Sequence, residues 1–149
     1  MSEMEYPAAR EYLDQVRKAK NHVKRLRYRL ENLRMLLTDT AVHPADVPHT
    51  GSGDLQKHET IQAEIDELER EIATAEKRER EIREKVGVTI CRLEDPTVQR
   101  VLILFILEEK GWKDIADIML FRRSSVYKII ENGLSELESI LTKEKDGAG

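Results

Sequence analysis

Apolar residues recur every three or four positions along two long stretches of the chain. Side chains at this spacing share one face of an α-helix, and alternating steps of three and four form the seam of a coiled coil. The pattern predicts two long helices, residues 7–37 and 55–93, each with one apolar seam. The first seam consists of Ala9, Tyr12, Val16, Ala19, Val23, Leu26, Leu30, Leu33 and Leu37. The second consists of Ile61, Ile65, Leu68, Ile72, Ala75, Ile82, Val86 and Leu93.

The segment between these helices, residues 38–54, lacks the periodicity and contains two prolines and two glycines. Both residue types interrupt helices, so we expect a mobile loop. Its histidines, His43 and His49, have no cysteine or third histidine beside them in the segment. We therefore expect solvated side chains there and no metal site. Within the second helix, Gly87 favours a bend.

The two predicted helices carry opposite charge. Residues 10–37 contain nine basic and three acidic side chains, whereas residues 54–85 contain seven and eleven. Helices of opposite charge favour pairing, which predicts an antiparallel helical hairpin, or coiled coil. A hairpin that buries only one seam of each helix buries little apolar surface, so it is weakly stable by itself. It therefore needs a further partner, either the C-terminal domain or a second copy in a homodimer. The basic run 17–29 has an alternative role, contact with DNA phosphates.

A new unit begins after the second helix. Asp95 is suited to cap a helix that has Pro96 at its first position. We expect this helix to continue to Lys110 and to end at Gly111, a common C-terminal capping residue. Its segment 101–107 is apolar all round, so other parts of the protein must cover it on more than one face.

Two further helices are predicted at residues 112–119 and 123–141, joined by Leu120–Arg122. Two helices with so short a connection, the first containing a small residue (Ala116), match the helix-turn-helix plan. We expect residues 142–149 to be a disordered tail. The apolar stripe of the first helix is Trp112, Ile115, Ala116 and Met119. That of the second is Val126, Ile129, Ile130, Gly133, Leu134, Leu137 and Leu141.

The start of the second of these helices carries the candidate DNA-binding side chains. Arginine and lysine suit guanine edges and phosphates, serine suits either, and tyrosine suits a phosphate or a thymine methyl group. The helix turns acidic further on, at Glu131, Glu136 and Glu138, so contact is expected in its first two turns only. The candidate residues are Arg122, Arg123, Ser124, Ser125, Tyr127 and Lys128.

Composition excludes several other classes. The chain has one cysteine, Cys91, so it forms no internal disulfide, and we expect this thiol to be at least half-buried. The longest apolar run, residues 101–107, is far shorter than the roughly 20 residues that span a bilayer. The acidic N-terminus is unlike a signal peptide. No phosphate-binding glycine loop, nucleophile motif or metal-ligand cluster is present, so we expect neither an enzyme nor a cofactor.

The segment "GWKDIADIMLFRRSSVYKIIENGLSEL", residues 111–137, resembles region 4 of the sigma-70 class of transcription factors, which reads promoter DNA and docks on RNA polymerase. The whole chain is similar to a group of phage and prophage late-gene transcription activators. The resemblance implies an all-α fold: a helical hairpin (7–93) followed by a small helix-turn-helix domain (95–141). It also implies that Arg123 and Ser124 meet phosphate and base, and that Tyr127 and Lys128 reach base edges one turn later.

Two departures from the region 4 pattern bear on these roles. Leu120 stands where such turns often have glycine or asparagine, which tolerate a left-handed backbone. Tyr127 and Ser124 replace the usual arginine and glutamate, respectively, so no promoter preference carries over.

We therefore expect a regulator in the bacterial cytoplasm that binds double-stranded DNA, self-associates as a homodimer and activates phage late genes with RNA polymerase. Residues 95–141 contain six basic and eight acidic side chains, so non-specific DNA affinity should be weak and salt-dependent. One alternative is an adaptor that docks on RNA polymerase or another regulator without touching DNA. Another is a DNA-packaging recognition subunit that assembles into rings.

Overall fold

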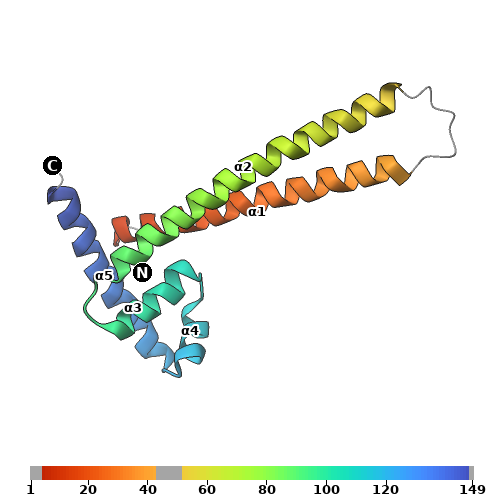
Figure 1. The fold of residues 1–149 in the computed structure, drawn as a ribbon. Coiled ribbons are helices and arrows are strands. Elements are labelled where there is room, and N and C mark those ends of the chain that lie inside the picture. Colours follow the sequence, from red (N-terminus) through yellow and green to blue (C-terminus); the bar gives the residue numbers. More distant parts are fainter. Residues whose placement is uncertain (1–4, 43–51, 148–149) are drawn as a thin grey trace. The chain divides into compact units, whose positions relative to one another are not determined.

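The computed structural model describes residues 5–42 and 52–147, with side chains over 5–38 and 55–144. Every regular element in these ranges is a helix, so the protein is all-α, as predicted (Figure 1). None of the described helices combines the length and apolar character that a membrane span requires. The elements are α1 (Pro7–Val42), α2 (Ser52–Ile90), α3 (Pro96–Leu102), the π-helix η1 (Ile103–Leu107), α4 (Trp112–Met119) and α5 (Arg123–Gly147).

The end of α1 and the start of α2 extend further than the apolar pattern predicted. Residues 38–42 and 52–54 are helical, so the prediction of a loop was wrong for them. Backbone hydrogen bonding carries a helix beyond its last buried residue when no proline intervenes. The rest of the predicted loop, with His43 and His49, lies outside the described residues. Near its other end α2 passes through Gly87 as regular helix.

The chain divides into two compact units. The first unit contains residues 1–18 and 80–149, and the second contains residues 19–79. Both α1 and α2 run through the two units, so this division falls at other residues than the predicted domains 7–93 and 95–141.

The first unit has one continuous apolar core. The start of α1 and the end of α2 share it with α3, η1, α4 and α5, and its fully buried members include Val16, Ile90, Ile106 and Leu137. Helix α5 packs against both α3 and α4. The apolar segment 101–107 lies in this core. Other helices of the unit therefore cover it, as its apolar composition predicted.

The second unit is a pair of helices with a small core. Its buried residues come from α1 and α2, and the ion pairs Arg27–Glu76 and Arg34–Glu69 show that the two helices run in opposite directions. The helices lie side by side along this unit (Figure 1). The buried residues are Val23, Leu26, Leu30, Ile61, Ile65, Leu68, Ile72 and Ala75, all members of the predicted seams.

The helix that begins at Pro96 ends differently from the prediction. Asp95 accepts a hydrogen bond from the Thr97 N–H at 2.8 Å and caps α3, as expected. The helix then widens into η1, where the Glu108 N–H donates to the Ile103 carbonyl, and ends at Leu107. Arg83 of α2 donates to the Leu107 carbonyl at 2.7 Å and so satisfies a group that the next helical turn would otherwise occupy.

The glycine expected to end this helix has another place. Gly111 has φ −70° and precedes α4 as its N-terminal capping residue, whereas Glu109 takes the positive φ of 53°. The capping prediction for Gly111 was therefore wrong. A contact between α2 and the last residue of η1, which the local sequence does not reveal, accompanies this end of the helix.

The predicted disordered tail is largely helical. Helix α5 continues to Gly147, six residues beyond the predicted end at Leu141. Arg92 forms an ion pair with Glu144, and the Thr142 hydroxyl donates to the Glu138 carbonyl at 2.7 Å. Packing of Leu141 in the first unit's core continues the helix into these residues. Residues 148–149 lie outside the described part of the chain.

Candidate nucleic-acid interface

The candidate interface is built around the turn between α4 and α5, residues 120–122. Leu120 ends α4 in the left-handed conformation, with φ 59° and ψ 40°. The N–H groups of Leu120 and Phe121 both donate to the Ala116 carbonyl, which reverses the chain direction over a few residues. The next helix follows at once, because the Val126 N–H donates to the Arg122 carbonyl at 3.1 Å.

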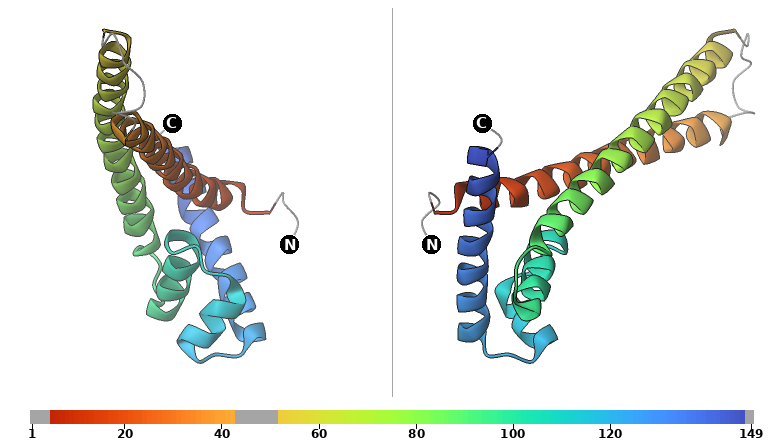
Figure 2. Two further views of the ribbon diagram at one scale, coloured as in Figure 1. Left: turned by 90° about the vertical axis from the view of Figure 1, so that its right-hand side faces the viewer. Right: turned by 60° about the vertical axis from the view of Figure 1, so that its left-hand side comes forward.

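The two helices are held together by small and β-branched residues. Ile115 and Ala116 of α4 are buried, as are Val126 and Ile130 of α5. Ala116, the small residue of α4 at this point, is 3% exposed. Figure 2 shows α4 and the start of α5 meeting at the turn in both of its views.

All six predicted DNA-binding residues are exposed. They occupy the turn and the first two turns of α5, and between Arg122 and Lys128 Val126 is the buried residue. Within the described residues, no ion pair engages the charged groups of Arg122, Arg123 or Lys128. The unbonded N–H groups at the start of α5 add partial positive charge beside these side chains.

An aromatic contact at this surface was not predicted. The rings of Trp112 and Tyr127 meet edge to face, with centroids 6.4 Å apart and planes at 78°. Lys113 places its Nζ atom 5.5 Å from the centre of the Trp112 ring. Trp112 was expected in the buried stripe of its helix, yet 38% of it is exposed. The position of Trp112 in the first turn of its helix, directly before a lysine, was the signal available in the sequence.

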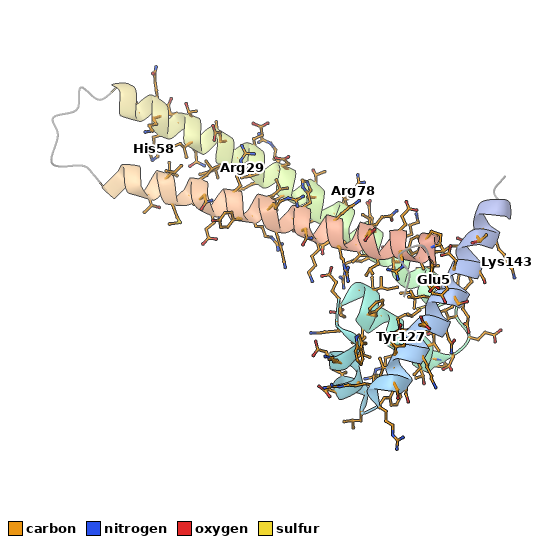
Figure 3. The ribbon with its side chains drawn as sticks, turned by 180° about the vertical axis from the view of Figure 1, so that it is seen from behind. Glu5, Arg29, His58, Arg78, Tyr127 and Lys143 are labelled. Carbon is orange, nitrogen blue, oxygen red and sulfur yellow. The ribbon has the colours of Figure 1, made fainter. Side chains whose placement is uncertain are left out.

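This contact gives Tyr127 a defined place. Tyr127 is 38% exposed, and Trp112 supports its ring from the start of α4. Figure 3 labels Tyr127 near the start of α5 and Lys143 near its opposite end. A tyrosine held in this way loses less side-chain entropy when a ligand binds than a freely rotating one.

The acidic residues of α5 have different surroundings. Glu136 is exposed and Glu131 is half-buried. Glu138 accepts hydrogen bonds from the backbone N–H groups of Ala8 and Ala9, so its carboxylate is engaged in the fold. The three residues therefore do not form one acidic surface available to a partner.

Cys91 and the possible metal ligands add nothing to this site. Cys91 is exposed in the turn after α2, so the prediction that its thiol is at least half-buried was wrong, and Ile90 fills the neighbouring core position. In the parts of the chain that the structure describes, no group of three or more His, Cys, Asp or Glu side chains is placed to hold a metal ion.

Comparisons with protein-family models, with curated proteins and with solved structures give no match to this chain.

Proposed function

We propose that this protein is a DNA-binding transcriptional regulator of phage or prophage genes that activates late genes together with RNA polymerase. In this proposal α4 and α5 are the two helices of a helix-turn-helix, and the start of α5 enters the major groove. One observation supports it above the others. Six polar and basic side chains are exposed around the start of α5, and their cationic groups form no ion pairs among the described residues.

In this proposal each side chain at the start of α5 contacts a different part of the DNA. Arg123 and Ser124 meet phosphate and the first base, and Lys128 reaches a base edge one turn later. Tyr127, supported by Trp112, contacts a phosphate or a thymine methyl group. The assignment to phage late genes rests on the similarity of the whole chain to phage and prophage activators, and the link to RNA polymerase rests on the resemblance of residues 111–137 to sigma region 4.

Charge sets the expected strength of binding. The segment 95–141 has two more acidic than basic residues, so non-specific attraction to DNA is small. Binding therefore depends on a few contacts at the start of α5 and should weaken steeply with salt.

A second function is favoured by a different observation. Ile118, Leu120 and Phe121 are exposed apolar residues at the α4–α5 turn, with exposed fractions of 47%, 91% and 38%. Apolar side chains exposed together are typical of protein-binding surfaces. In this alternative the chain is an adaptor that docks on RNA polymerase or another regulator through the turn and does not read DNA.

A binding titration separates the two functions. Labelled fragments of the genome that encodes the chain are titrated with wild type, with Arg123→Ala/Lys128→Ala and with Lys77→Ala/Arg78→Ala, at two salt concentrations. Lys77 and Arg78 are exposed on α2, so their double variant changes the net charge equally but leaves α5 intact. We expect site-selective binding that the α5 variant weakens at least about tenfold, because each base contact contributes roughly 1–3 kcal/mol.

Other outcomes contradict DNA reading. If no fragment is bound selectively at low salt, or if both double variants bind equally, α5 does not recognise a DNA sequence. Co-precipitation of RNA polymerase that is lost in Leu120→Asp but retained in Arg123→Ala/Lys128→Ala would then establish the adaptor.

A further inference from the structure

The two sides of the second unit, residues 19–79, differ in how their charges are paired. On one side, two ion pairs join α1 to α2: Arg27–Glu76 at 2.7 Å and Arg34–Glu69 at 3.1 Å. The opposite side is a groove between the same helices. The groove is lined by Arg29, Leu33, Glu64, Glu67, Leu68 and Glu71.

The charged side chains of the groove form no ion pairs with one another in the part of the chain that the structure describes. Within the described residues, no ion pair joins Arg29 to any of the groove's glutamates. Glu64, Glu67 and Glu71 are three and four positions apart, so they lie along one helix face and repel one another. Figure 3 shows Arg29 on α1 beside α2. This arrangement calls for cationic side chains from outside the chain.

Apolar surface accompanies these charges. Leu33 is half-buried in the groove, and Leu36 follows it by three residues on the same side of α1, with 53% of its surface exposed. The core beneath the groove contains eight buried residues. A two-helix unit with so small a core gains stability when a further helical surface covers it.

The helices of this unit carry complementary charge along their length. The α1 part, residues 19–42, has six basic and two acidic side chains, whereas the α2 part, residues 52–79, has four and nine. A second copy of the chain presents both kinds of surface side by side. It therefore offers a basic helix edge to the acidic edge of the first copy, and the reverse.

We propose that the grooves of two copies pack together in a parallel four-helix dimer, with α1 of each copy lying over α2 of the other. The twofold axis then runs along the helices. The other twofold arrangement would place α1 on α1 and α2 on α2, with like charges in contact. In the proposed dimer, Arg29 of one copy faces Glu71 of the other, Arg25 and Glu67 lie on either side of this contact along the helices, and Leu33 and Leu36 are covered. This inference is independent of whether the protein binds DNA.

Charge exchange in the full-length chain tests this arrangement. Glu67→Lys/Glu71→Lys places like charges at both contacts of the dimer, so sedimentation equilibrium should show a dissociation constant raised at least about tenfold. Arg25→Glu/Arg29→Glu should weaken the homodimer for the same reason. An equimolar mixture of the two variants should recover the dimer, because each interchain contact again joins opposite charges.

A matched control separates the groove from net charge. Glu59 and Glu84 are exposed on α2 and do not line the groove, so Glu59→Lys/Glu84→Lys makes the same change in charge elsewhere. This control should remain dimeric. Circular dichroism of every variant verifies that the helices persist. A monomeric wild type at millimolar concentration, or a dimer that is insensitive to both groove variants, would overturn the proposal.

Cross-linking tests the direction of the two copies. In a Cys91→Ser background, chains carrying only Arg29→Cys are mixed with chains carrying only Glu71→Cys and treated with a short bismaleimide. Rotation about an axis along the helices keeps each residue at its own height, so these two positions approach each other between chains. We expect mixed cross-linked dimers to dominate. Efficient cross-linking of the Arg29→Cys chain to itself would instead place α1 on α1 and refute the parallel arrangement.

Discussion

The carboxylate of Glu138 accepts a hydrogen bond from the backbone N–H of Ala9 at 2.8 Å, and a second from Ala8 at 3.1 Å. A residue near the middle of α5 thus caps the first turn of α1, 129 positions earlier in the chain. The first-turn N–H groups of a helix have no partner within the helix, and a carboxylate also stabilises the positive end of its dipole. This contact fastens the start of α1 to the C-terminal helix.

Removal of this cap should destabilise the protein. We expect Glu138→Ala to lower the free energy of unfolding by about 1–2 kcal/mol, measured by urea denaturation, because two N–H groups lose a charged acceptor. Glu136→Ala on the same helix is the control, since Glu136 is exposed and should change stability little. Equal effects of the two substitutions would show that the cap contributes nothing.

Leu120 combines a left-handed backbone with a side chain that is 91% exposed. For a residue with a β-carbon this conformation costs about 1–2 kcal/mol, which glycine avoids. Leu120→Gly should therefore raise the midpoint of thermal unfolding, after subtraction of the greater entropy of glycine in the unfolded chain. Leu120→Ala keeps the β-carbon and should give no gain. A loss of stability in Leu120→Gly would show that the exposed leucine contributes packing.

Two helical glycines should respond in opposite ways to alanine. At Gly133 a β-carbon would lie 2.9 Å from Val98 Cγ1 and 3.0 Å from Leu102 Cδ1, because α3 crosses α5 there. At Gly87 the nearest atom, Leu107 Cδ1, is 3.7 Å away. Gly133→Ala should cost about 1–3 kcal/mol through overpacking, and Gly87→Ala should gain up to about 1 kcal/mol of helix stability. Chemical denaturation of both variants provides the comparison, and a stabilised Gly133→Ala would contradict the observed close approach.

Cys91 should react as an accessible thiol. It is exposed in the turn between α2 and α3, so a thiol reagent such as Ellman's reagent should modify it completely without denaturant. Helicity after modification should be unchanged, because the side chain is outside the core. A reaction that requires urea would show that the thiol is covered in solution.

The sequence predicted which positions within the helices are buried better than it predicted where the helices end. Buried positions in both seams and in the stripe of α5 followed from spacing alone, because helical periodicity is a property of neighbouring residues. Asp95 and Pro96 marked the start of α3, because capping there also depends on neighbouring residues. The exposure of the residues at the start of α5 was also predictable, since Val126 and Ile130 define which side faces inward.

The sequence by itself thus determined an all-α protein, the faces that its helices bury and the position of the turn at Leu120–Arg122. Tertiary structure decided where the helices stop and which surfaces they share. Arg83 donates to the Leu107 carbonyl at the end of η1, Glu138 joins α5 to the start of α1, and Trp112 supports Tyr127 at the surface. The physical reason is that periodicity and the Asp95 cap arise from neighbouring residues, whereas the Glu138 cap, the Arg83 hydrogen bond and the aromatic contact depend on partners elsewhere in the chain.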